Sequence, residues 1–217
     1  EEVSLQLAQS YVDVRRYQSA LNVLKKLVQK NPDVIMAYYY MATIYSTYLH
    51  QMEEAIQNYR KILEWEPSNI RVRRALAQSY VDQKKNKEAL AEYLELEKYS
   101  PQDISVQLQI ALLHYELGEA KEAIRQFEQI LEKNPEADRI RYYLGLLYEK
   151  TGRPEDAKKT YEKIPTTSGL YKEGRLRFAR LLQSEGKLDE AVSSMQEAVL
   201  QKTTVSEFYE YLAILWE

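Results

Sequence analysis

The most regular feature of the sequence is a set of short apolar stripes with the spacing of α-helices. Between Ile104 and Ala137, apolar residues recur at three- and four-residue intervals in two successive segments. This spacing places them on one face of a helix. Gly118 lies in the turn between the segments, and Pro135 ends the second one because a proline ring does not fit a helix interior. The stretch therefore predicts a hairpin of two amphipathic helices.

The same hairpin recurs along the whole chain with a period close to 34 residues. Two positions in each repeat hold small residues. In the first helices they are Ala8, Ala42, Ala77, Ala111, Gly145, Ala179 and Ala213, and in the second helices Ala20, Ala55, Ala89, Ala123, Ala157 and Ala191. Small side chains let helices approach closely, and the large residues that follow them, mostly aromatic, fill the space between turns. One hairpin buries too little surface alone, so we expect consecutive repeats to stack.

This period, with its order of small, aromatic and proline residues, resembles the tetratricopeptide repeat family. The resemblance covers the entire chain and implies an all-α fold, a right-handed α-solenoid of about six helix pairs plus a terminal helix. It implies a single superhelical domain over 1–217, with repeats at 1–34, 35–69, 70–103, 104–137, 138–171 and 172–205, and a final helix over 206–217. The tryptophan usual in the family's first helix is replaced by Ser4, Tyr38, Arg73, Gln107, Arg141 and Arg175.

Two irregularities interrupt the period. The second repeat has one extra residue within 46–52, so its turn should bulge and expose Tyr48 or His50. In the fifth repeat, Pro165 arrives early and the segment 165–169 replaces the end of the second helix. Because the register resumes at Ala191, we expect the stack to continue beyond a shortened helix and a longer connection.

Composition narrows the possible functions. The chain is 45% hydrophobic and 29% charged, with a formal net charge of -3, as in an ordinary folded protein. Nucleic acid is not an expected partner, because its binding needs a clustered excess of lysine and arginine. No apolar run approaches the ~18 residues that span a bilayer, so membrane insertion is not expected either. The sequence does not indicate a compartment.

Residues suited to catalysis are scarce. The chain has no cysteine, no phosphate-binding glycine loop, and only two histidines, His50 and His114. His114 holds a position that tyrosine occupies in most other repeats, which favours a packed, hydrogen-bonded histidine over a catalytic one. We therefore expect no enzymatic activity, no cofactor and no metal site. Trp65, near the end of a second helix, is expected to pack on the next repeat rather than bind a ligand.

The resemblance implies that the first helices line a concave groove where a partner binds. The candidate binding residues placed there are Tyr39, Tyr40, Arg71, Arg74, Gln78, Leu108, Leu112, Tyr115, Arg139, Tyr142, Tyr143, Arg177 and Arg180. Tyrosine and arginine are enriched at interface hot spots, where a ring supplies contact area and a guanidinium binds a carboxylate. The site favours an extended peptide or a protein segment, acidic or aromatic in character.

A run of three arginines, over 71–74, lies in the first turn of a predicted helix. The helix dipole disfavours cations there by ~0.3–1 kcal/mol each. Either internal carboxylates, namely Glu64, Glu66 and those of neighbouring repeats, or an acidic partner should offset this cost, and the sequence leaves both open. The clamp of lysine and asparagine with which some family members grip a peptide C-terminus is not reproduced in the corresponding positions.

These observations favour a non-catalytic scaffold that binds protein. The alternatives are an accessory domain of a larger enzyme or of a secretion or envelope assembly, and a self-associating structural scaffold. The final helix carries Phe208, Leu212, Leu215 and Trp216 in positions that earlier first helices bury against their own second helix. We therefore expect the native chain to continue beyond Glu217; the alternative is that this helix is itself the cap and packs only on the preceding pair. If the native chain ended at Glu217, the apolar stripe would be a candidate surface for self-association or for docking a partner.

Overall fold

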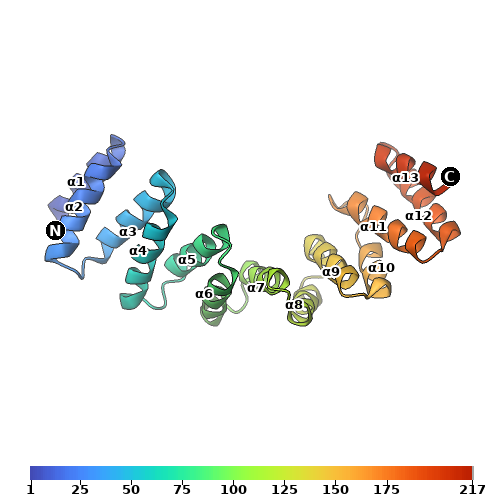
Figure 1. The fold of residues 1–217 in the computed structure, drawn as a ribbon, viewed down its shortest axis with the longest axis horizontal. Helices are drawn as coiled ribbons and strands as arrows, with labels where there is room; N and C mark the ends of the chain where they lie inside the picture. Colours follow the sequence, from blue (N-terminus) through green and yellow to red (C-terminus); the bar gives the residue numbers. More distant parts are fainter. Residues whose placement is uncertain (217) are drawn as a thin grey trace. The chain divides into compact units, whose positions relative to one another are not determined.

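The computed structural model describes residues 1–216, which are helical without any strand (Figure 1). The elements are α1 (Glu2–Asp13), α2 (Tyr17–Lys30), α3 (Ile35–Thr43), η1 (Ile44–Leu49), α4 (Met52–Trp65), α5 (Ile70–Asp82), α6 (Asn86–Tyr99), α7 (Ile104–Glu116), α8 (Ala120–Lys133), α9 (Asp138–Lys150), α10 (Pro154–Glu162), α11 (Tyr171–Ser184), α12 (Leu188–Gln201) and α13 (Ser206–Trp216). Thirteen α-helices in these residues agree with the predicted number, and the all-α solenoid is confirmed.

The helices form two compact units, Glu1–Val106 (unit 1) and Gln107–Glu217 (unit 2), with the division inside α7. In unit 1, α1 packs on α2, α3 on α4 and α5 on α6, and each pair also contacts the next. In unit 2, α9 packs on α10, α11 on α12, and α13 on α12. The single domain over 1–217 stays a prediction.

Small residues lie where the paired helices approach. All six second-helix alanines, from Ala20 to Ala191, are completely buried. Their first-helix counterparts are also buried, with the exception of Ala213 in α13. The aromatic residues beside them fill the remaining space, and Phe127 and Tyr161 are among the largest fully buried side chains. The sequence pattern thus identified the close helix contacts correctly.

The extra residue of the second repeat is absorbed by a π-helix, η1, and not by a bulged turn. η1 follows α3 directly and ends at Leu49; the next residue, His50, caps it with a φ of 54°, in the left-handed region. Tyr48 is 41% exposed, and its ring stacks on Tyr17 with centroids 4.7 Å apart. Exposure of Tyr48 and His50 is confirmed, but the insertion widens the helix because a π turn holds more residues than an α turn.

The second helix of the fifth repeat is short, as expected. α8 ends at Lys133, so the 34-residue period would place the end of α10 at residue 167, whereas α10 ends at Glu162. After α10, Ile164 is buried against α11, where a Cβ atom on Gly174 would lie 2.8 Å from its Cδ1 atom. A longer connection then leads to α11, and the repeat continues.

Polar side chains occupy the positions where the family usually has tryptophan, and three of them form hydrogen bonds with the turn that precedes their helix. Each donates a hydrogen bond to the carbonyl of the proline six residues earlier: Tyr38 to Pro32 at 3.0 Å, Arg73 to Pro67 at 2.7 Å, and Arg141 to Pro135. A side-chain donor thus satisfies a carbonyl beyond the end of each preceding helix.

Trp65 packs within its own repeat. Its ring lies 5.5 Å from that of Tyr38, and the Lys61 ammonium lies 5.0 Å from the Trp65 ring centroid. These contacts form because the last turn of α4 lies beside the start of α3 in the antiparallel hairpin. Packing of Trp65 on the next repeat stays a prediction.

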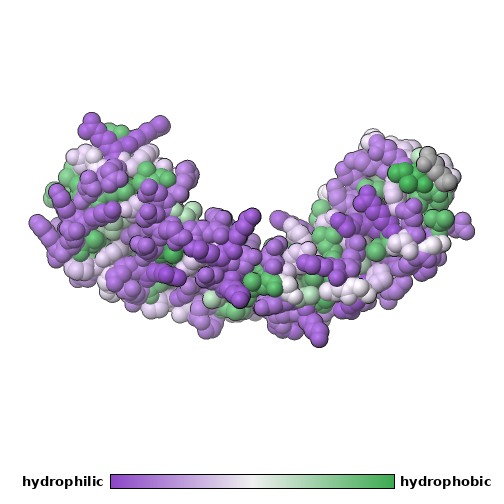
Figure 2. All heavy atoms as spheres, viewed as in Figure 1, coloured by the Kyte–Doolittle hydropathy of each residue, from purple (hydrophilic) through white to green (hydrophobic). Residues whose placement is uncertain are grey.

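The last helix, α13, is covered on one face only. Phe208, Leu212 and Leu215 are buried in the core of unit 2, while Trp216 is 66% exposed. The four residues were expected to share one uncovered face. Instead three of them are buried, and the exposed residues of α13 include Tyr209, Ala213, Ile214 and Trp216. Figure 2 shows hydrophobic surface over the α13 end of the chain. Self-association through this helix stays a prediction.

Candidate functional site

A pocket of about 770 Å³ opens in unit 1 where α3, α4 and α5 meet. Three of the predicted site residues line it: Tyr39, Tyr40 and Arg71. The remaining lining residues are Met36, Thr43, Tyr59, Glu66, Asn69, Val72 and Ala75. An apolar and aromatic lining with a few convergent polar groups is the usual character of a binding pocket.

A network of three side chains forms the polar part of this pocket. The Tyr39 hydroxyl donates to Glu66 Oε2 at 3.2 Å, and Asn69 Nδ2 donates both to Glu66 Oε2, at 2.5 Å, and to the Tyr39 hydroxyl oxygen. Burial, followed by the Glu66 charge, raises the pKa of Tyr39. Asn69 Oδ1 also accepts a hydrogen bond from the Val72 amide at 3.0 Å and caps α5. Burial and the Glu66 charge thus favour the neutral phenol, and the hydrogen bonds fix its position.

The arginine run at the start of α5 divides into two paired residues and one unpaired residue. Arg73 binds Glu92, and Arg74 binds Asp103, each at 2.6 Å. Arg71 is exposed, lines the pocket and forms no ion pair with any residue of 1–216. Internal carboxylates therefore offset two of the three charges, and one guanidinium remains available to a partner.

The carboxylates that neutralise the run were not those expected from sequence. Glu64 pairs with Lys61 at 2.5 Å, and Glu66 belongs to the network with Tyr39. Glu92 and Asp103 were missed because they lie on α6 and before α7, 19 and 29 residues from the arginines that they bind. Sequence proximity therefore does not identify the partners.

Asp103 gives the stability of unit 1 a dependence on pH. A hydrogen bond from the Ser105 hydroxyl, together with Arg74 and the backbone amides of Ser105 and Val106, lowers the pKa of Asp103 from 3.8 to about 2. A lowered pKa stabilises the fold above the unfolded value, and this stability is lost as the pH falls from about 4 towards 2.

We expect Asp103→Ala to lower the free energy of unfolding by about 1–2 kcal/mol at neutral pH, because it removes a helix cap and a partly exposed ion pair. The difference from the parent protein should shrink as the pH falls towards 2. Urea unfolding followed by circular dichroism at several pH values measures this. Asp103→Asn keeps the acceptor but not the charge, so it should be intermediate; a difference that stays constant with pH would contradict the role of the charge.

Two other predicted site residues of unit 1 are engaged outside the pocket. Besides Asp103, Arg74 donates to the Ser105 hydroxyl at 3.2 Å. Gln78 donates to Asp82 at 2.9 Å and accepts from the Tyr93 hydroxyl at 3.4 Å. The structure thus brings Tyr39, Tyr40 and Arg71 together and leaves Arg74 and Gln78 in local hydrogen bonds. Met36 and Tyr59 were missed, although Met36 precedes Tyr39 by one helical turn.

In unit 2, one group of predicted site residues gathers around α9 and α11. The Tyr142 ring lies 5.9 Å from that of Tyr161, whose hydroxyl donates to Glu149 at 2.5 Å. Arg177 pairs with the same carboxylate at 3.4 Å. Burial and the Glu149 carboxylate raise the pKa of Tyr161, which keeps the hydroxyl protonated as a donor. Within this cluster, the Glu149 carboxylate therefore pairs with Arg177 and accepts from Tyr161.

The other predicted residues of unit 2 contact aromatic rings or the core. The Arg139 guanidinium lies 5.7 Å from the ring of Tyr143, and that of Arg180 lies 5.6 Å from the ring of Tyr211. Lys150 lies 4.6 Å from the ring of Tyr115. Leu108 and Leu112 are partly buried against the core of unit 2. A cation over an aromatic face contributes only about 0.5–1 kcal/mol at exposed sites.

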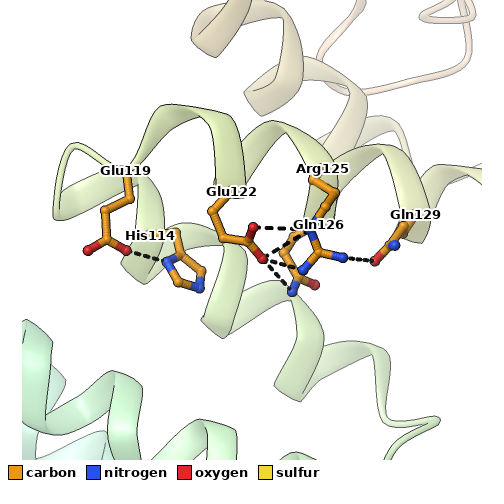
Figure 3. A network of polar contacts seen from close by, with 6 residues as sticks. All are labelled: His114, Glu119, Glu122, Arg125, Gln126 and Gln129. Carbon is orange, nitrogen blue, oxygen red and sulfur yellow. Dashed lines mark hydrogen bonds and ion pairs between the residues drawn. The ribbon is translucent and has the colours of Figure 1, made fainter.

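His114 is packed and hydrogen-bonded, as the sequence predicted (Figure 3). Its side chain is 11% exposed, and Nδ1 lies 2.6 Å from Glu119 Oε2 across the turn between α7 and α8. Further along α8, Arg125 pairs with Glu122 and lowers the pKa of that carboxyl. Arg125 also donates a hydrogen bond to Gln129. The histidine thus anchors a turn.

Three models described as tetratricopeptide repeat match the sequence, over residues 2–33, 49–113 and 108–168. The chain belongs to the tetratricopeptide repeat family. No curated protein matches the sequence. Within residues 1–216, no helix is both long and apolar enough to cross a membrane, and no three side chains of the metal-binding types come together as ligands.

Solved structures show the same tetratricopeptide fold. A crystal structure of MamA is 19% identical with a TM-score of 0.67, and the match covers 80% of this chain and 94% of MamA. A structure of Pseudomonas aeruginosa pilF is 22% identical with a TM-score of 0.55, covering 98% and 96% of the two chains. YrrB, described as a TPR protein with an unusual peptide-binding site, is 15% identical with a TM-score of 0.62, covering 87% of this chain and 96% of YrrB.

Proposed function

We propose that this protein is a non-catalytic scaffold that binds a segment of a partner protein in the pocket formed by α3, α4 and α5. One observation carries the proposal: Tyr39, Tyr40 and Arg71, which has no ion pair within residues 1–216, line this pocket of about 770 Å³. A tyrosine loses little side-chain entropy when it binds, and arginine forms bidentate bonds to a carboxylate. YrrB, a structure of the same fold, carries a peptide-binding site, which supports this use of the fold.

The lining indicates the character of the bound segment. Met36, Tyr40 and Tyr59 offer an apolar surface for one aliphatic or aromatic side chain. Arg71, at the N-terminal turn of α5, offers the charge that an adjacent aspartate or glutamate needs. The preferred segment is therefore an apolar residue next to an acidic one, in an extended peptide.

Selection of random linear peptides displayed on phage against the protein tests this proposal. We expect the enriched sequences to pair an aromatic or aliphatic residue with an acidic one. For a synthetic peptide of the enriched sequence, Tyr40→Ala and Arg71→Glu should each weaken binding roughly tenfold or more, as at interface hot spots. Lys87→Glu, a matched charge reversal at an exposed residue of α6 outside the pocket, should change affinity less than twofold. Equal effects of the two reversals would contradict the site.

A further inference from the structure

A second pocket, of about 400 Å³, lies in unit 2 between α10, α11 and α12. One repeat earlier, α8, α9 and α10 form an equivalent pocket of about 360 Å³. Arg141 and Thr160 of the earlier pocket stand 34 residues before Arg175 and Ser194 of the later one. The two pockets can therefore be compared position by position within one chain.

In the earlier pocket, both polar groups have partners. Arg141 donates to the Pro135 carbonyl and pairs with Asp138. The Thr160 hydroxyl donates to the Asp156 carbonyl at 2.6 Å. This is the ordinary state of buried polar groups, which are nearly always hydrogen-bonded.

In the later pocket, the corresponding groups have no partner. Arg175 forms no hydrogen bond or ion pair within residues 1–216, and its guanidinium lies 5.5 Å from the ring of Tyr171 and 5.9 Å from that of Phe178. Ser194 is 8% exposed, and its buried hydroxyl has neither donor nor acceptor nearby. The Arg175 guanidinium and the Ser194 hydroxyl are therefore free to donate hydrogen bonds to a bound ligand.

The early end of α10 explains why Arg175 lacks the acceptor that its counterparts have. In repeats that end with a proline, the residue six positions before the arginine supplies a carbonyl acceptor, as Pro67 does for Arg73. Six positions before Arg175 stands Gly169, in the connection that follows the shortened helix. A sequence difference explains why Arg175 also lacks a carboxylate partner. Ser194 stands three repeats after Glu92, in the equivalent position, and Glu92 pairs with Arg73 at 2.6 Å.

Around these donors the pocket is strongly acidic. Its four carboxylates, none of which forms an ion pair within residues 1–216, are Glu162, Asp189, Glu190 and Glu197. The earlier pocket has no carboxylate and is lined by Arg141 and Lys163. An anionic ligand is therefore disfavoured at the later pocket, and a cationic one with a neutral acceptor is favoured.

We propose that the pocket between α10, α11 and α12 binds a basic, extended segment of a second protein. A main-chain carbonyl of that segment accepts from Arg175, in the role that proline carbonyls play in other repeats, and the Ser194 hydroxyl bonds the same backbone. Lysine or arginine side chains of the segment pair with the rim carboxylates, Glu190 and Glu197 among them. This surface differs from the pocket of unit 1 in location and in the charge of its partner.

Fluorescence anisotropy with a labelled peptide of alternating lysine and glycine, at low salt, tests the role of the rim. The double variant Glu190→Gln with Glu197→Gln should weaken binding roughly tenfold. Glu132→Gln with Glu136→Gln removes the same charge from exposed residues outside the pocket, and should weaken binding less than twofold. Equal losses for the two double variants would show attraction by net charge alone and overturn the site.

Ser194→Glu separates a specific site from simple attraction. It rebuilds the arrangement of Arg73 with Glu92 in the sixth repeat, so Arg175 gains an internal partner while the pocket gains a negative charge. The proposal expects severalfold weaker binding of the lysine and glycine peptide, whereas simple attraction predicts tighter binding; unchanged or tighter binding would overturn the backbone contact. If this variant does not fold by circular dichroism, Arg175→Lys provides the test, because it keeps the charge but loses the planar fork. Severalfold weaker binding supports the contact, and unchanged binding overturns it.

Discussion

Replacing Ala123 or Ala111 with leucine is expected to lower the free energy of unfolding by ~1–3 kcal/mol, more than Tyr115→Ala does. Both alanines are completely buried in the core of unit 2, where neighbouring helices leave no room for three further carbon atoms. The larger side chain must adopt a strained rotamer or push the backbone away. Tyr115 is only partly buried and packs at the edge of the core.

Thermal and urea unfolding of the three variants, followed by circular dichroism, measure the difference. Ala120→Leu is a matched control, because Ala120 also lies on α8 but is only partly buried. It should cost less stability than leucine at Ala111 or Ala123, since a side chain at this partly buried position at the edge of the core can extend towards solvent. Equal midpoints for the Ala111, Ala123 and Tyr115 variants would contradict the assignment of helix faces.

Gly145→Ala is expected to destabilise the protein by ~1–3 kcal/mol, although alanine is the better helix former. A Cβ atom at this position would lie 2.4 Å from Cε1 of Tyr161. The Tyr161 ring cannot retreat, because it is completely buried and its hydroxyl is bonded to Glu149 at 2.5 Å. The clash therefore outweighs the gain in helix propensity of ~1 kcal/mol.

Gly169→Ala provides the matched control for this prediction. A Cβ atom there meets no other atom within 4 Å, so stability should change by less than ~0.5 kcal/mol. Gly145→Ala combined with Tyr161→Leu should cost less than the sum of the single variants, because removal of the ring removes the clash. Additive losses in urea unfolding would show that the ring is not the source of the strain.

The helices and their close contacts could be predicted because they depend on spacing alone. Ala123 and its counterparts repeat at a fixed interval, and a small residue at such an interval indicates where two helices touch. The shortened α10 was predicted for a similar reason, since Pro165 ends a helix wherever it stands. Both are local properties of the chain.

The pairing of long side chains could not be predicted in this way. Arg73 reaches Glu92 on the neighbouring helix, and Trp65 packs back on Tyr38, because side-chain reach and helix packing decide these contacts. The same holds for the candidate site. Sequence placed Tyr39 and Arg71 on the same expected surface. Only the structure shows that, among the described residues 1–216, Arg71 has no carboxylate partner while Arg74 has one.

The π-helix in the second repeat shows how the chain tolerates an insertion. One residue added to an α-helix rotates every later residue of that helix by ~100°, which would turn the start of the following connection away from its neighbour. In η1 the hydrogen-bonded turn widens and absorbs the added residue before the helix ends at Leu49. α4 then begins in its normal place, and Ala55 is as completely buried as Ala89 in the next repeat. The added residue is therefore accommodated within η1, and the helix contacts of the later repeats keep their positions.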